Sequence, residues 1–130
     1  MSHFSTVKTE LRQREPLVQA LQDLGLPPQE GSKEVRGYRG QTIVAELAVT
    51  MPQGGDLGFR WNEQRGAYEL VTDLDLWRQP VPIERFLAQL SQRYALNTVL
   101  AETLKEGFEV AEQRTTVDGS IELVVTRWDA

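Results

Sequence analysis

The hydrophobic residues change their spacing along this chain, and that change is the strongest constraint on its fold. From Pro82 to Gly107 they recur every three or four residues, as on one face of an α-helix. From Thr42 to Met51, and on both sides of the Asp118–Gly119 pair, they alternate with other residues, as in β-strands. A chain that contains both periods is predicted to have an α+β fold.

The same patterns predict the other elements of a single domain spanning residues 1–130. Strands are expected over 3–12, 34–37, 42–51, 57–61, 67–76, 108–117 and 120–128, helices over 15–24 and 83–106, and a Pro- and Gly-rich loop over 26–33. The order strand, helix, strand, strand occurs twice. One interpretation is duplication of a β-α-β-β unit, and the other is that this order is common among α+β folds. We expect an antiparallel sheet of about six or seven strands with two helices on one face.

The composition excludes several classes of function. The 130 residues include no cysteine, which rules out disulfides, thiolate nucleophiles and clusters held by cysteine. The net charge of −5 makes nucleic acid an unfavoured partner. The sequence has neither the ~18-residue apolar run of a membrane-spanning helix nor a secretory signal, so we expect a cytoplasmic protein without membrane insertion.

Two helices on one face are expected to leave the other face of the sheet uncovered. The alternation places on that face Glu46, Glu69, Asp73 and Glu122, mixed with Val44, Val71, Val124 and Trp128. Phe59 and Trp61 are candidate aromatic anchors, although at least one of them is expected in the core. An acidic, half-apolar face predicts a non-enzymatic protein-binding module that docks a partner through this face or through an edge strand.

Two alternatives stay open beside this hypothesis. Asp73 and Asp75 share one strand face and are the basis for a small-ligand or divalent-metal-dependent enzyme. No third ligand accompanies the pair, so we assign no metal-binding or catalytic residue and expect no cofactor. The other alternative is weak RNA binding through the basic residues between Lys33 and Arg39. A protein partner is favoured over both, and self-association into a homo-oligomer also stays open.

Several segments resemble a known family over nearly the whole chain. They are Met1–Thr9, Leu17–Gly25, Val35–Tyr38, Gly58–Phe59 with Trp61, Tyr68–Asp73, Gln92–Tyr94, Gly107–Phe108, and Asp118–Gly119 through Arg127–Trp128. The family is the uncharacterised one called hypothetical chloroplast reading frame thirty-five. This resemblance implies a photosynthetic organism, a cytosolic or stromal setting, and an accessory role in a redox or assembly system. The family has no assigned catalytic residues, so none is transferred to this chain.

Overall fold

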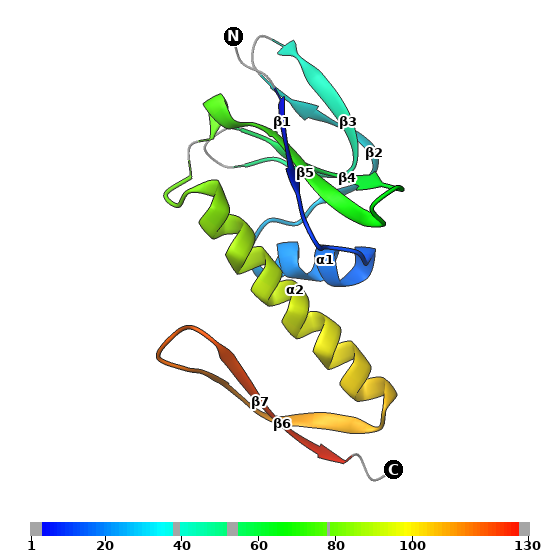
Figure 1. Ribbon diagram of the computed structural model, residues 1–130, viewed down its shortest axis with the longest axis vertical. Helices are drawn as coiled ribbons and strands as arrows, with labels where there is room; N and C mark the ends of the chain where they lie inside the picture. Colours follow the sequence, from blue (N-terminus) through cyan, green and yellow to red (C-terminus); the bar gives the residue numbers. More distant parts are fainter. Residues whose placement is uncertain (1–3, 38–39, 52–54, 78, 128–130) are drawn as a thin grey trace.

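Figure 1 shows the computed structural model of the chain, which describes residues 4–37, 40–51, 55–77 and 79–127. In chain order the elements are β1 (Phe4–Lys8), α1 (Arg14–Asp23), β2 (Gln29–Arg36), β3 (Thr42–Val49), β4 (Leu57–Asn62), β5 (Ala67–Asp73), the short 3-10 helix η2 (Leu74–Leu76), α2 (Ile83–Lys105), β6 (Phe108–Thr115) and β7 (Ile121–Arg127). The predicted α+β class is confirmed.

Among the described residues all strand pairs are antiparallel, but the strands form two sheets where the sequence pattern predicted one. The large sheet has the order β1-β5-β4-β3-β2, and β6 pairs with β7 in a second sheet beside the far half of α2 (Figure 1). The length of α2 explains the separation. At about 1.5 Å per residue its 23 residues extend about 35 Å, which carries the last hairpin away from the large sheet.

Helix α1 follows directly from its sequence. Pro16 lies in the first turn, where its missing N–H removes no helical hydrogen bond. Leu17, Ala20 and Leu21 have helical spacing and are completely buried. Gly25, with a φ of 76°, adopts the left-handed conformation that ends many helices.

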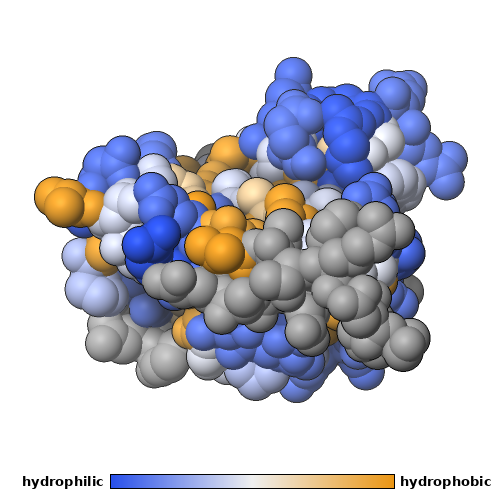
Figure 2. All heavy atoms as spheres, turned by 90° about the horizontal axis from the view of Figure 1, so that it is seen from below, coloured by the Kyte–Doolittle hydropathy of each residue, from blue (hydrophilic) through white to orange (hydrophobic). Residues whose placement is uncertain are grey.

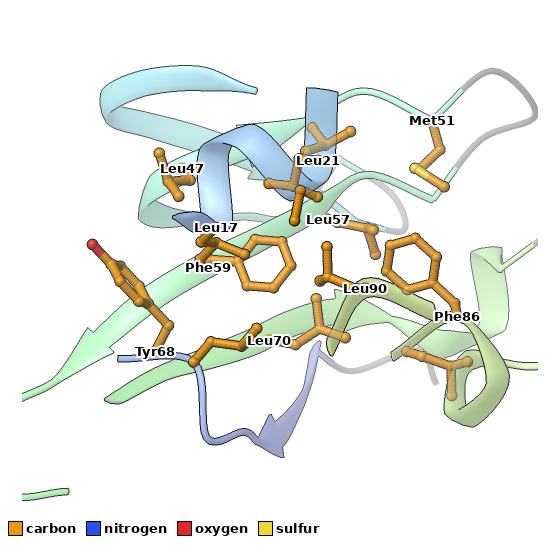
Figure 3. Packing of buried hydrophobic residues seen from close by; sticks show 14 residues of the cluster. Leu17, Leu21, Leu47, Met51, Leu57, Phe59, Tyr68, Leu70, Phe86 and Leu90 are labelled. Carbon is orange, nitrogen blue, oxygen red and sulfur yellow. The ribbon is translucent and has the colours of Figure 1, made fainter. Parts of the chain in front are cut away.

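The main hydrophobic core lies between the large sheet and both helices. Leu47, Phe59 and Leu70 lie directly opposite one another on β3, β4 and β5, so their side chains share one face. Figure 3 shows these side chains pointing toward the helix residues Leu17, Leu21, Phe86 and Leu90. The prediction of two helices on one face of a sheet is thereby confirmed.

The opposite face of the large sheet is covered at its centre, contrary to the expectation of an open face. A second cluster of buried residues lies there, made of Val35, Ala45, Ala48 and Val71, with Phe4 and Ile43 packed against it. Val71, which the alternation assigns to a free face, is completely buried.

Gly58 explains how this face becomes covered. A Cβ atom at Gly58 would lie 2.5 Å from Cγ2 of Val35 and 2.9 Å from Cβ of Ala45. Strand β2 is not a neighbour of β4 in the sheet, so Val35 reaches Gly58 only because β2 and the first half of β3 curl over β4. The absence of a side chain at Gly58 permits this close approach.

Strand β2 corrects the predicted loop over 26–33, because it begins at Gln29. Its register against β3 shifts between Glu30 and Lys33, which indicates a β-bulge. Gly31, with a φ of 95°, lies at this bulge. The glycine that favoured a loop therefore marks an irregularity within a strand.

Candidate docking site

Trp61 and Glu46 lie on the surface of the large sheet. Trp61 is 37% exposed and packs edge-to-face against Tyr68, with ring centroids 5.0 Å apart. The register between β3 and β4 ends at Leu47 and Phe59. Beyond that point the carboxylate of Glu46 accepts a hydrogen bond from the backbone N–H of Trp61 at 2.8 Å. The side chain of Glu46 therefore provides an acceptor for the N–H of Trp61 at a point where β3 no longer pairs with β4.

Glu69 is held by neighbours on its own sheet. Its side chain is only 12% exposed. The carboxylate accepts a hydrogen bond from Nδ2 of Asn62 at 2.6 Å and lies 3.7 Å from the guanidinium of Arg60. Most of its hydrogen-bonding capacity is directed within the fold, which leaves little for a partner.

The structure places Phe59 and Asp73 inside the protein, so neither lies on a surface that a partner can reach. Phe59 is completely buried, and Asp73 is 1% exposed. The carboxylate of Asp73 accepts a hydrogen bond from the backbone N–H of Asp75 at 3.1 Å and caps η2. Across residues 4–37, 40–51, 55–77 and 79–127, no three or more His, Cys, Asp or Glu side chains are grouped as metal ligands.

The arginines near the predicted RNA-binding edge form ion pairs within the chain. Arg36 lies 2.7 Å from Asp56, and Arg14 pairs with Glu30. Arg39 lies outside the described residues. The described arginines of this region therefore do not present an unbroken basic strip.

Glu122 lies far along the chain from these residues, on β7 of the second sheet. Its carboxylate is 3.8 Å from the guanidinium of Arg114 on β6, and both side chains are more than half exposed. Trp128 lies outside the described residues. The predicted docking residues thus do not form one surface: Glu46, Trp61 and Glu69 lie on the large sheet, Glu122 lies on the small one, and Phe59 and Asp73 are buried.

A groove that the sequence analysis missed lies between α2 and β7. We call it the distal groove, and it is lined by Gln92, Ala95, Leu96, Val99, Ser120, Ile121 and Leu123. Its volume is about 310 Å³. Gln92 donates a side-chain hydrogen bond to the backbone carbonyl of Gly119, which joins the hairpin turn to the helix. Most of the remaining lining is apolar.

Hydrophobic side chains are also exposed around the distal groove. Val99, which lines the groove, is 47% exposed, and Leu104, further along α2, is 57% exposed. Figure 2 views the molecule from the end that carries β6 and β7, and it shows hydrophobic residues gathered on this face among hydrophilic ones. Exposed apolar groups that gather beside a groove are typical of interaction surfaces.

The free edge of β7 adds unpaired backbone groups to this surface. The N–H of Thr116 donates to the carbonyl of Ser120 at 2.8 Å, and hydrogen-bonded pairs alternate with non-bonded pairs along an antiparallel ladder. Counting from that bond, Glu122 directs its backbone groups toward β6. Ile121 and Leu123 direct theirs outward, because β7 pairs only with β6 in the described part of the chain.

The turn between β6 and β7 holds a carboxylate that stays ionised. Asp118 accepts hydrogen bonds from the hydroxyl of Thr116 and, at 3.0 Å, from the N–H of Ser120. These bonds, with that of Thr116 the largest cause, lower the pKa of Asp118 to about 2. The turn at the start of β7 is therefore negatively charged at neutral pH.

The sequence feature that could have revealed the distal groove is the length of α2. The hydrophobic stripe continues to Leu104, yet the buried residues of the helix end at Leu96. Helical spacing predicts the helix but does not show how much of its apolar face is buried. A helix longer than the strands that it covers must extend its apolar face beyond them, and here it meets only a two-stranded sheet.

Neither helix in the described part of the chain combines the length and apolar character that crossing a membrane requires. The family described as "Protein of unknown function (DUF1257)" matches residues 20–124. "Uncharacterized protein ycf35" of Pyropia yezoensis is 40% identical over 129 residues, which cover 99% of each chain. The proteins of that name from Cyanophora paradoxa and Guillardia theta are each 38% identical over 128 residues, covering 98% of each chain. No solved structure matches the chain. The resemblance to the hypothetical chloroplast reading frame is confirmed.

Proposed function

The chain belongs to the DUF1257 family, and from this premise we propose that it is a non-enzymatic accessory protein that binds a protein partner by strand addition at β7. The observation that carries the proposal is the free edge of β7 beside the apolar distal groove. The partner contributes an extended segment whose alternate side chains are apolar.

The backbone of β7 supplies the first part of the recognition. The N–H and C=O groups of Ile121 and Leu123 point away from β6, so an added strand forms main-chain hydrogen bonds with them. A two-stranded sheet is marginal by itself, and a third strand gives it additional hydrogen bonds and a larger buried face.

The distal groove supplies the second part. Between α2 and β7 the side chains line a groove instead of closing on one another. Val99 and Leu123 line this space from opposite sides. Every second side chain of an added strand points to one face. Apolar residues at those positions enter the groove and lose their contact with water, which favours binding.

The organisms in which the relatives occur support a proposal about the cellular setting. Proteins named ycf35 occur in Pyropia yezoensis, Cyanophora paradoxa and Guillardia theta. We propose that the chain works in the cytoplasm or stroma of a photosynthetic organism, where it assists a photosynthesis-related system by holding its partner.

Two substitutions distinguish the distal surface from the large sheet. Leu123→Pro removes an outward N–H without removing a hydrogen bond to β6, and it also removes a groove side chain. Glu46→Arg reverses a charge on the large sheet. Tagged wild-type and variant chains are used to recover proteins from the photosynthetic host, and the recovered sets are compared by quantitative mass spectrometry.

We expect Leu123→Pro to lose at least nine-tenths of a partner that Glu46→Arg retains. Hydrogen exchange on the purified complex then has to show slower exchange at the amides of Ile121 and Leu123. Loss of the partner with Glu46→Arg alone would assign docking to the large sheet and contradict the proposal.

A further inference from the structure

We propose that the segment added to β7 is basic: an extended stretch of another protein in which apolar residues, facing α2, alternate with Lys or Arg, facing away from it. This inference rests on the proposed function, because it names the chemistry of the partner at the same edge. Three observations support it: the side-chain order of β7, the position beside Glu122, and the concentration of negative charge in the last part of the chain.

The two faces of β7 differ in their chemistry. Ile121 and Leu123 line the distal groove, so their side chains lie on the face toward α2. Glu122 lies between them in the strand, and its side chain therefore points to the opposite face, where it is more than half exposed. An added strand alternates between the same two faces, whichever way it runs. Its side chains next to Ile121 and Leu123 meet the groove, whereas the side chain next to Glu122 meets a carboxylate and water.

The position beside Glu122 on the free edge suits a cation. Arg114 lies 3.8 Å from Glu122, but it belongs to β6, and a partner adds on the other side of β7. Exposed ion pairs such as this one contribute little to stability, so Arg114 does not satisfy Glu122 fully. Opposite charges on neighbouring strands attract, and like charges there repel. A Lys or Arg beside Glu122 therefore favours binding, and an Asp or Glu opposes it.

Negative charge is concentrated in this part of the chain. Residues 102–130, which include the end of α2 with β6 and β7, contain seven acidic and three basic residues and so carry −4 of the net charge of −5. Asp118 adds an ionised carboxylate at the turn before β7, where it accepts hydrogen bonds from Thr116 and Ser120. An acidic region attracts a basic segment and speeds its approach. It also disfavours a nucleic acid, whose phosphates it repels.

Short peptides test this preference directly. Three labelled peptides of equal length alternate Val with Lys, Val with Glu, or Ser with Lys, and fluorescence anisotropy with the full chain measures their dissociation constants at about 0.15 M salt. The Val–Glu peptide keeps the apolar side chains but reverses the charge, and the Ser–Lys peptide keeps the charge without the apolar side chains. We expect the Val–Lys peptide to bind at least ten times more tightly than either of the others.

Substitutions at Glu122 assign the preference to β7. In Glu122→Lys we expect the Val–Lys peptide to bind about fivefold more weakly and the Val–Glu peptide about fivefold more tightly. Glu122→Gln removes the charge without placing a second cation beside Arg114, and we expect a smaller change in the same direction. Glu63→Lys, in the turn between β4 and β5, is the matched control: it changes the net charge equally and should leave both affinities within about twofold. Circular dichroism checks that the variants keep their fold.

A Val–Lys peptide that binds no more tightly than the Val–Glu peptide would overturn the basic partner, as would equal effects of Glu122→Lys and Glu63→Lys. If hydrogen exchange at the amides of Ile121 and Leu123 still slows with either Val peptide, strand addition holds and only the charge preference fails. If no peptide slows exchange there and Leu123→Pro loses no protein recovered from the host, the proposed function fails as well.

Discussion

Arg36, at the end of β2, donates three hydrogen bonds to the buried carboxylate of Asp56. The backbone N–H lies 3.3 Å from Oδ2, Nε lies 2.7 Å from Oδ2, and Nη2 lies 3.2 Å from Oδ1. The hydrogen bond to Asp56 and its negative charge raise the pKa of Arg36 above its ordinary value. Asp56 directly precedes β4, so this contact fixes the end of β2 over a strand that is not its neighbour in the sheet.

Asp56→Ala is expected to loosen the curl of β2. The substitution leaves the backbone N–H of Arg36 without its acceptor, and we expect the free energy of unfolding to fall by about 1–3 kcal/mol. Urea denaturation followed by circular dichroism measures the change. Glu63→Ala, in the exposed turn between β4 and β5, is the control and is expected to change stability by less than about 0.5 kcal/mol. An equal loss of stability in the two variants would show that Asp56 does not hold β2 over β4.

Gly58→Ala tests the close approach of β2 to β4. The new Cβ atom would overlap Val35, Ala45 and Val71, so we expect destabilisation of about 1–3 kcal/mol. Val35→Ala removes the Cγ2 atom that comes closest. The double variant is therefore expected to be more stable than the sum of the two single effects predicts. Simple additivity in urea denaturation would mean that Val35 does not lie over Gly58.

Leu90 and Leu104 provide a comparison along one helix. Leu90 is completely buried against the large sheet, whereas Leu104 is 57% exposed. Leu90→Ala is expected to cost about 2–5 kcal/mol, because it leaves a cavity in the main core. Leu104→Ala is expected to cost less than about 0.5 kcal/mol in the monomer. Thermal denaturation at low protein concentration checks both values, and a similar loss for Leu104 would show that α2 is buried along its whole length.

Tyr94 links α2 to the segment that precedes α1. Its hydroxyl oxygen accepts hydrogen bonds from the backbone N–H groups of Arg12 at 3.1 Å and Gln13 at 3.0 Å. Tyr94→Phe keeps the ring but removes the acceptor, so we expect a loss of about 1 kcal/mol. Amide exchange at Arg12 and Gln13 should accelerate in this variant, and unchanged exchange at both amides would contradict the contact.

The hairpin turn is expected to weaken in acid. Because the pKa of Asp118 is lowered to about 2, its contribution to the turn is complete above the ordinary value of 3.8 and is lost as the pH falls toward 2. Carbon NMR of the carboxyl group measures this titration. Thr116→Val removes the largest cause and should move the pKa back toward 3.8. A wild-type pKa already at 3.8 would show that the hydrogen bonds do not hold the carboxylate.

The sequence predicted those parts of the fold that depend on local patterns. The hairpins at Asn62–Gly66 and Asp118–Gly119 follow from turn chemistry, and α2 follows from its hydrophobic spacing and from Pro82 at its N-cap. The curl over Gly58 was not predicted. Alternation shows which side chains share a face of a strand, but it does not show which distant segment lies on that face.

The same limit, that local patterns do not reveal contacts between distant segments, applies to the predicted docking residues. Edge-strand docking was one of the predicted modes, and Glu122 lies on the strand that now carries the proposal. Asp73 was misassigned to a surface because a charged residue in an alternating strand ordinarily points to water, and here it caps η2 from within the sheet. The exposure of Val99 was not predicted, because helical spacing does not reveal where the neighbouring sheet ends.

The attachment of the small sheet to α2 has a mechanical consequence. Helix α2 is continuous over Ile83–Lys105, and a continuous helix resists bending far more than a flexible linker does. A molecule bound at β7 is therefore restricted in its orientation relative to the large sheet. The fold is thus suited to keep two bodies at a set spacing and angle.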